Sequence, residues 1–333
     1  MNKRWDVYGI GNALVDFEVE IDEGTLAALG LEKGTMTLID EARHDHLMHV
    51  LNGRWHGRAC GGSAANSIIA VAQLGGKAFY SCRVADDEAG HFYIEDLRNN
   101  GVDTRFDGGA KSGVTGKCIV MITPDAERTM NTFLGITSEL HPDIIDVEAL
   151  ASSRYLYIEG YLASSPSAIE TVRHARAVAK ENDVKTALSL SDPSMVQFFR
   201  DGMQALIDNG VDLLFCNREE ALRWTGTNDL NDAVDVLRSQ AREVVVTLGA
   251  DGALIITDEG MEKVSAYPVK AVDTNGAGDM FAGAFLYAIT HGYSHSDAAR
   301  LASYGSALVV SQFGPRLYGE PLAQLRAYPK GGQ

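Results

Sequence analysis

Extended and helical segments alternate regularly through the second half of this 333-residue chain. Four segments have the length of strands and are rich in apolar residues: residues 154–162, 185–191, 211–217 and 243–249. Three segments between them repeat apolar residues at helical spacing: residues 165–182, 195–210 and 230–240. Strands joined by helices of this length pair in parallel and are covered on both faces. We therefore predict an α/β fold with a mostly parallel central sheet.

The first third of the chain follows a different pattern. Residues 5–22, WDVYGIGNALVDFEVEID, are typical of a strand that leaves the sheet and carries on, and residues 116–135 are typical of a β-hairpin. Extended segments inserted between α/β units predict a small α+β lid over one edge of the main domain. We place the lid at 13–57 and 105–135, and the main nucleotide-binding domain at 1–12, 58–104 and 136–333.

Charge and composition exclude several classes of partner. The net charge of −16 argues against nucleic acid and anionic membranes, because both need a basic surface. No apolar run approaches a membrane span, and the acidic residues that follow the first basic ones are unlike a signal peptide. The four cysteines are scattered, with no CxxC pair, so we expect thiols and no zinc site. These features predict a cytoplasmic protein that acts on small molecules.

One glycine-rich turn, within VKAVDTNGAGDMFAGAFLYAI (269–289), joins a predicted strand to a predicted helix. The amides of Gly276, Ala277 and Gly278 can hold an anion, because a helix N-terminus has unpaired N–H groups and partial positive charge. Asp279 follows directly, and a carboxylate beside an anion site can accept the proton of an attacking hydroxyl. The turn thus predicts phosphoryl transfer to an alcohol. A tight connection with a capping aspartate is the alternative.

The same turn resembles the D-T-x-G-A-G-D signature of the PfkB (ribokinase-like) carbohydrate kinases, with Asp273 to Asp279 in its seven positions. The family motif G-G-x-x-x-N is matched by residues 61–66, and N-x-x-E by residues 217–220. The three motifs occur in the family's order over nearly the whole chain. The resemblance implies a ribokinase-like three-layer α/β/α domain with a lid, and a kinase that uses ATP and Mg²⁺. It leaves open the K⁺ ion that family members often hold near Asp273.

Within the family, four tracts resemble eukaryotic adenosine kinases: residues 9–22, 60–68, 188–199 and 212–221. This resemblance implies transfer of the ATP phosphoryl group to the 5′-hydroxyl of a nucleoside, converting adenosine to AMP in purine salvage. The alternatives are a PfkB-type kinase of ribose or another furanose, an inosine or guanosine kinase, and a non-catalytic nucleoside sensor. The long, helix-bearing lid favours a monomer over a lid-paired dimer.

The resemblance also implies a role for individual residues. The catalytic group comprises Asp279 as base, the anion-binding Gly276, Ala277 and Gly278, and Arg128, which reaches from the lid to the phosphate. The sugar is expected to contact Asn12, Asp16, Gly62, Ser63 and Asn66. The purine base of the nucleoside is expected to lie against Met36, Leu38, Met130, Leu134 and Tyr161, although such residues are also ordinary lid core. ATP is expected to contact Ser189, Asn217, Thr247, Gly249, Ser303 and Gly314.

The expected metal site and two departures complete these assignments. Glu220, together with Asn217, is expected to organise Mg²⁺ directly or through water, because Mg²⁺ keeps most of its waters and takes few protein carboxylates. Ser189 stands where many family members have an asparagine. Met36 stands where eukaryotic adenosine kinases have a glutamine, so the identity of the base stays open.

Overall fold

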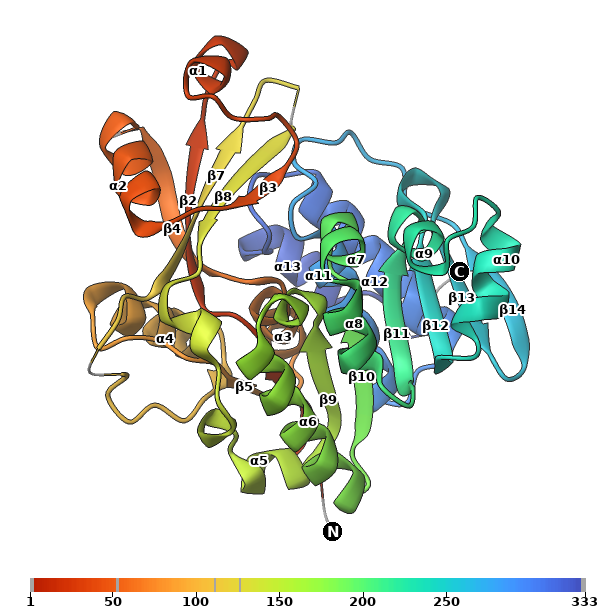
Figure 1. Ribbon diagram of the computed structural model, residues 1–333. Coiled ribbons are helices and arrows are strands. Elements are labelled where there is room, and N and C mark those ends of the chain that lie inside the picture. Colours follow the sequence, from red (N-terminus) through yellow and green to blue (C-terminus); the bar gives the residue numbers. More distant parts are fainter. Residues whose placement is uncertain (1–2, 52–53, 111, 126, 331–333) are drawn as a thin grey trace.

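The computed structural model describes residues 3–51, 54–110, 112–125 and 127–330, which form two sheets (Figure 1). The larger sheet has nine strands in this order: β14 (Gly260–Val264), β13 (Ala253–Thr257), β12 (Ala241–Thr247), β11 (Val211–Asn217), β10 (Lys185–Ser189), β9 (Ser153–Glu159), β1 (Trp5–Ile10), β5 (Ala78–Ser81) and β6 (Val102–Asp103). Neighbours from β12 to β6 pair in parallel, whereas β13 and β14 add an antiparallel hairpin at one edge.

Side chains that alternate along the central strands build one apolar core on each face of this sheet. On β9, Tyr155 and Tyr157 enter one core, while Leu156 and Ile158 enter the other. The first core is covered by α3 (Ser63–Gln73), α4 (Glu88–Asn99), α11 (Ala277–Thr290), α12 (His295–Val310) and α13 (Gly319–Arg326). The second is covered by α5 (Val147–Ala151), α6 (Pro166–Glu181), α7 (Pro193–Phe198), α8 (Arg200–Ile207), α9 (Arg218–Thr225) and α10 (Leu230–Leu237). The predicted three-layer α/β/α arrangement is thus confirmed.

The smaller sheet has five strands in the order β3 (Met36–Leu38), β8 (Arg128–Phe133), β7 (Gly116–Ile122), β2 (Leu14–Glu20) and β4 (Trp55–Gly61). Its outer face packs on α1 (Glu23–Ala28) and α2 (Glu41–Val50) through a small core that includes Val19, Leu47 and Met121. Its inner face carries Cys118, Val120 and Met130. The sheet stands over the carboxyl ends of the parallel strands (Figure 1). We refer to this sheet with α1 and α2 as the lid.

The boundaries of the lid and the main domain stay a prediction. Residues 52–53, 111 and 126 of the predicted lid lie outside the described ranges, as do residues 1–2 and 331–333 of the predicted main domain. The predicted hairpin at 116–135 is formed by β7 and β8, which pair antiparallel from Lys117 opposite Phe133 to Ile122 opposite Arg128.

The strand predicted before the glycine-rich turn is absent, because β14 ends at Val264 and residues 265–276 form an irregular segment that leads into α11. Two other predicted elements are divided in the structure. The extended segment 5–22 forms β1 and β2, which belong to different sheets. The chain crosses between them at Gly11, where a Cβ would lie 2.7 Å from Ala64 and Glu159, so no side chain fits. The helix predicted at 195–210 is broken into α7 and α8 around Phe199, whose φ and ψ are −124° and 36°.

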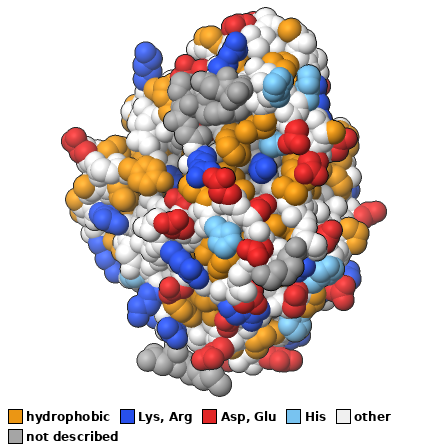
Figure 2. Space-filling model, turned by 90° about the vertical axis from the view of Figure 1, so that its left-hand side faces the viewer, with side chains coloured by type: hydrophobic (Ala, Val, Ile, Leu, Met, Phe, Trp, Pro, Cys, Tyr) orange, Lys and Arg blue, Asp and Glu red, His pale blue; other side chains and the backbone are white. Residues whose placement is uncertain are grey.

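The surface of the described residues agrees with a mixed-charge exterior. Acidic, basic and apolar side chains intermingle on the face shown in Figure 2, and no continuous basic area is visible among the described residues there. All four cysteines are free, and three of them are buried. Within the described ranges, no helix combines the length and apolarity needed to cross a membrane.

Candidate active site

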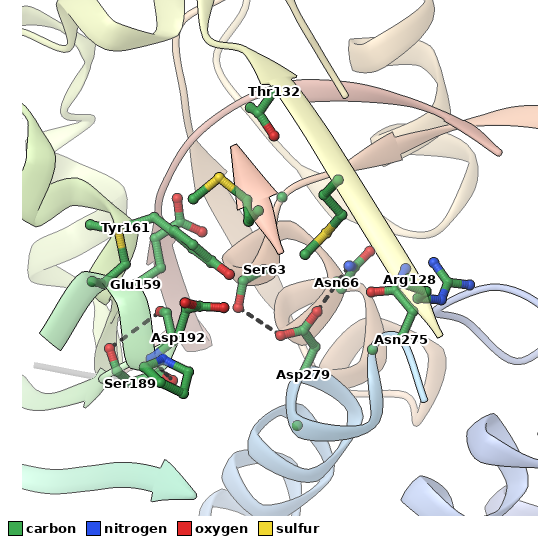
Figure 3. A pocket seen from close by; sticks show the side chains of 18 of the residues that line it. Ser63, Asn66, Arg128, Thr132, Glu159, Tyr161, Ser189, Asp192, Asn275 and Asp279 are labelled. Atoms are coloured by element: carbon green, nitrogen blue, oxygen red, sulfur yellow. Dashed lines mark hydrogen bonds between the residues drawn. The ribbon is translucent and has the colours of Figure 1, made fainter. Parts of the chain in front are cut away.

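A cavity of about 650 Å³ lies between the inner face of the lid sheet and the carboxyl ends of β9 to β12 (Figure 3). We call it the acceptor cavity. It brings together most of the residues expected to hold the substrate, the phosphate and the metal: Asn12, Asp16, Met36, Leu38, Gly62, Ser63, Asn66, Arg128, Met130, Leu134, Tyr161, Ser189, Asn217, Glu220, Thr247, Gly276, Gly278 and Asp279. These residues come from both sheets and from six helices or turns, so only the folded chain assembles them.

A second cavity of about 590 Å³, the donor cavity, opens on the other side of the glycine-rich turn. Five of the expected residues line it: Thr247, Gly249, Ala277, Gly278 and Ser303. Thr247, Thr274, Gly278 and Phe281 line both cavities, so the two spaces meet at this turn. Gly314 lines neither cavity, and its N–H group instead donates to Asp273 Oδ2 at 2.8 Å.

The turn itself has the geometry of an anion site. Gly276 precedes α11 with a φ of 75°, in the left-handed region that favours glycine. A Cβ at Gly276 would also lie 2.5 Å from Pro315, so the position is closed to side chains on two grounds. The backbone of residues 276–278 thereby reaches the start of α11 with its first N–H groups unpaired within the helix.

Asp279 lies in the first turn of α11 and points toward α3 (Figure 3). Its Oδ1 accepts a hydrogen bond from Ser63 Oγ at 2.6 Å, and its Oδ2 accepts one from Asn66 Nδ2 at 3.0 Å. Burial raises the pKa of Asp279 to about 6, although both hydrogen bonds and the charge of Arg316 lower it. A carboxylate with this pKa is mostly ionised at neutral pH and still basic enough to accept a proton.

Asp16 extends from β2 into the same cavity and is buried. It packs directly against Gly61, where an added Cβ would overlap the carboxylate. Burial raises the pKa of Asp16 to about 7, and the charge of Arg316 lowers it. The carboxylate is therefore held by steric fit more than by donors, which leaves its oxygens available to two hydroxyl groups.

Glu159 is a buried carboxylate of this cavity that the sequence analysis missed. It ends β9 and is 0 % exposed, and burial raises its pKa to about 7. Its Oε1 accepts the N–H of Asn12 at 2.6 Å, and its Oε2 accepts the N–H of Ala64 at 2.7 Å. Glu159 thus fixes two of the segments that carry expected sugar contacts. A glutamate at the carboxyl end of an apolar strand was the signal that could have revealed it.

Arg128 lines the acceptor cavity, but its guanidinium is engaged with Asp273. Nε and Nη2 each donate to one carboxylate oxygen, and Nη2 lies 3.7 Å from Glu18 Oε1. Asp273 is fully buried and also accepts the N–H of Asn275 at 2.9 Å. Arg128 therefore links strand β8 of the lid to the chain just before the glycine-rich turn at residues 276–278, which we call the anion turn. Its expected contact with phosphate stays a prediction.

Asn217 and Glu220 form a capping box at the start of α9. Asn217 donates its N–H to Glu220 Oε2 and its Nδ2 to Oε1, both at 2.8 Å, and burial raises the pKa of Glu220 to about 8. No group of three His, Cys, Asp or Glu residues within the described ranges is placed to hold a metal. Asp192 and Glu219 also line the cavity. This acidic but open donor set fits a hydrated Mg²⁺ bound mainly through nucleotide phosphates.

The lid forms the opposite wall of the acceptor cavity. Side chains of β8 alternate, so that Arg128, Met130 and Thr132 face the cavity while Thr129 and Asn131 do not. Met36 and Leu38 of β3 join Met130 along this wall, and Tyr161 approaches from the main domain (Figure 3). Cys118 and Val120 of β7 line the same wall and were not among the expected residues. Residues two apart on a strand share one face, so the predicted hairpin strand was the signal that could have placed both on this wall.

Residues 42–321 match the model of the pfkB family of carbohydrate kinases, and the chain belongs to this family. The adenosine kinase of Saccharomyces cerevisiae is 26% identical, over 94% of this chain and 97% of that protein. The adenosine kinase structure from Sinorhizobium meliloti superposes with a TM-score of 0.91 at 35% identity, covering 97% of this chain and 99% of that one. A structure named probable sugar kinase from Rhizobium etli has a TM-score of 0.91 at 33% identity, covering 97% and 98%. The chain is thus a kinase of the family that phosphorylates sugars and nucleosides with Mg²⁺ and ATP.

Proposed function

We propose that this chain transfers the terminal phosphoryl group of ATP to the 5′-hydroxyl of a nucleoside, with adenosine as the preferred acceptor. The observation that carries the proposal is the meeting of two cavities at residues 276–279. The donor cavity is largely apolar, as suits a nucleotide base. The acceptor cavity combines an apolar lid wall with a polar floor, which is formed by Asn12, Asp16, Asn66, Glu159 and Asp279. A nucleoside has the same division between sugar and base. The similarity to adenosine kinases from yeast and S. meliloti supports the choice of adenosine.

In the proposed reaction, the ribose hydroxyls donate to Asp16, and the amide side chains of Asn12 and Asn66 add further contacts. The 5′-hydroxyl then lies at Asp279, which accepts its proton as the oxygen attacks the phosphorus. The backbone amides of residues 276–278 stabilise charge on the transferred group, and the bond to the ADP leaving group breaks. Mg²⁺, organised by Glu220 and Asn217, neutralises phosphate charge when it is bound.

Closure of the lid completes this site. A base and an anion site that stayed open to solvent would hydrolyse ATP, so water must be excluded before transfer. We infer that Arg128, which is bonded to Asp273 in this structure, turns toward the phosphate as the substrates bind. In the absence of substrate, its bond to Asp273 balances a carboxylate that is fully buried.

A kinase of ribose or another furanose is the second candidate. The polar floor alone would hold a free sugar, and the R. etli structure carries the name of a sugar kinase. If the acceptor is a nucleoside, inosine and guanosine stay alternatives to adenosine. The wall offers contact area but no strong hydrogen-bonding group to select the base, since it is formed by Met36, Leu38, Val120 and Met130. The acceptor therefore has to be identified by assay.

The deciding experiment couples ADP release to a spectrophotometric signal with Mg-ATP and five acceptors in parallel: adenosine, inosine, guanosine, ribose and fructose. Turnover with adenosine well above the others supports the proposal. Turnover with a free sugar alone keeps the base and the anion turn but overturns the nucleoside assignment. If no acceptor is phosphorylated while adenosine still binds, the chain is a nucleoside sensor.

A further inference from the structure

Arg316 is a buried arginine to which neither the motifs nor the proposed reaction gives a role. It follows α12 in the segment Gly314–Pro315–Arg316 and is 3 % exposed. Its three donor atoms reach three different elements: Nε to Asn66 Oδ1 of α3 at 3.1 Å, Nη1 to Asp96 Oδ2 of α4 at 2.9 Å, and Nη2 to Cys60 Sγ of β4 at 3.1 Å. A buried charge is costly unless it is paired and hydrogen-bonded, and these three contacts supply such partners.

The contact with Asn66 leads directly to Asp279. Asn66 accepts from Arg316 with its carbonyl oxygen and donates to Asp279 Oδ2 with its amide nitrogen. A guanidinium can only donate, so it fixes which end of the Asn66 amide faces away from Asp279. If the amide were reversed, its oxygen would face the carboxylate and its NH₂ group would face the guanidinium. Arg316 therefore keeps a hydrogen-bond donor aimed at the Asp279 carboxylate.

The residues before Arg316 contact the anion turn from behind. The Gly314 N–H donates to Asp273, and Pro315 lies against Gly276. The same short segment thus contacts the start of the turn and, through Asn66, the carboxylate at its end. A displacement of Arg316 would therefore also displace the partners that hold Asp279.

The charges around Asp279 make Arg316 important for its ionisation as well. In addition to burial, the charge of Asp279 raises the pKa of five side chains, Asp16 of β2, Tyr157 and Glu159 of β9, Tyr161, and Glu220 of α9, and the charge of Arg316 acts on Asp279 itself. Arg316 is the cation in this set, since Arg128 of β8 is paired with Asp273. Its charge lowers the pKa of both Asp279 and Asp16 against the effect of burial.

We propose that Arg316 is a positioning residue for phosphoryl transfer, which acts through Asn66 to hold the Asp279 carboxylate oriented and ionised. This inference rests on the proposed function of Asp279 as the base. A purely structural role would lower kcat equally at every pH. The proposed role predicts that the loss of kcat in a variant without the charge is larger at acid pH than at alkaline pH.

The test compares Arg316→Met, Arg316→Lys and Asp96→Asn with the wild type, measuring kcat and KM from about pH 5 to pH 9. For Arg316→Met we expect the acid limb of the kcat profile to move up by about one pH unit, so that the loss of kcat is about twofold at pH 7, approaches about tenfold at pH 5 and vanishes at alkaline pH. Arg316→Lys keeps the charge but not the three-way contact, so kcat should fall while the limb stays near its wild-type position. Asp96→Asn is the matched control, because Arg316 keeps its bond to Asn66 and the limb should not move up.

Circular dichroism and thermal unfolding show which variants are folded. In Arg316→Met, a loss of kcat that is equal at every pH would overturn the proposal, and so would the same upward shift of the acid limb in Asp96→Asn. If Arg316→Met does not fold, Arg316→Lys decides, and wild-type kcat in that variant overturns the orienting role. Carbon-13 NMR of labelled aspartate carboxyls, assigned with Asp279→Asn, follows the Asp279 titration without turnover. An unchanged titration in Arg316→Lys together with unchanged kcat rejects the inference, whereas a wild type inactive on every acceptor rejects the proposed function.

Discussion

The floor and the wall of the acceptor cavity are built in different ways. On the floor, the carboxylates are fixed by close individual contacts: Asp279 by hydrogen bonds from Ser63 and Asn66, and Asp16 by its fit against Gly61. On the wall, Met36 and Met130 are placed by strand alternation and packing. Proton transfer needs reacting atoms within hydrogen-bond reach. The affinity for the purine or other base of a nucleoside depends mostly on the apolar area that is buried. The difference teaches that floor substitutions should act on kcat and wall substitutions on KM.

Asp279→Asn should have the largest effect on the floor. The amide still fits between Ser63 and Asn66 but cannot accept the hydroxyl proton, so we expect kcat to fall by about 10²–10⁴-fold. The KM for the acceptor should change little. The coupled ADP assay measures both, and isothermal titration calorimetry checks acceptor binding. A variant with near wild-type kcat would show that Asp279 is only a helix cap.

Gly61→Ala tests how closely the floor is fitted. The added Cβ would overlap the Asp16 carboxylate and displace it from the sugar position. Because a displacement of about 1 Å can cost about 10²-fold, we expect a fall of that order in kcat/KM. Gly24→Ala, in helix α1 of the lid, is the control and should retain activity. Unchanged kcat/KM in Gly61→Ala would mean that Asp16 does not hold the acceptor.

Among the residues of the floor, the sequence predicted best those that lie within a short motif. Asp279 and Gly276 lie within one seven-residue motif, and their geometry follows from the glycine-rich turn at the start of α11, without the strand that was predicted before it. The sheet and its two covering layers were predictable because apolar periodicity is also a local property. Glu159 and Arg316 were not found, because their partners are distant in sequence: Asn12 lies 147 positions from Glu159, and Asn66 lies 250 positions from Arg316. Such pairs are set by the fold and not by any local pattern.

Arg128 shows a different limit of prediction. Its place on a lid strand that lines the cavity was implied by the family resemblance, but its partner Asp273 was not. The bond between Arg128 and Asp273 joins residues 145 positions apart, one in the lid and one in the main domain. Sequence patterns specify where a side chain is attached, whereas its partner across two sheets is set by the packing of the whole fold.

Two methionines on opposite faces of the lid sheet sharpen the comparison at the wall. Met130 lines the cavity, whereas Met121 is fully buried against α1 and α2. Met130→Ala should raise the KM for the acceptor by about tenfold through lost apolar contact, with kcat nearly unchanged. Met121→Ala should instead lower the free energy of unfolding by about 2–5 kcal/mol and leave KM alone. Steady-state kinetics and chemical denaturation of both variants measure this, and equal KM values in the two would contradict a base-binding wall.

The smallest effect within the working range of the enzyme is its pH dependence. The pKa of Asp279 is about 6, so kcat should fall as pH drops through 6, by about tenfold per unit on the acid side, in the wild type and equally in Met130→Ala. Protein stability should not follow this fall. Asp16, Glu159, Glu220 and Asp279 all have pKa values raised above those of an unfolded chain, so the native state binds their protons more tightly. Their contribution to the free energy of unfolding therefore grows as pH falls from about 8 toward about 4. We expect unchanged circular dichroism at a pH where kcat has already dropped, and a parallel loss of both signals would mean that acid inactivation is unfolding and not protonation of the base.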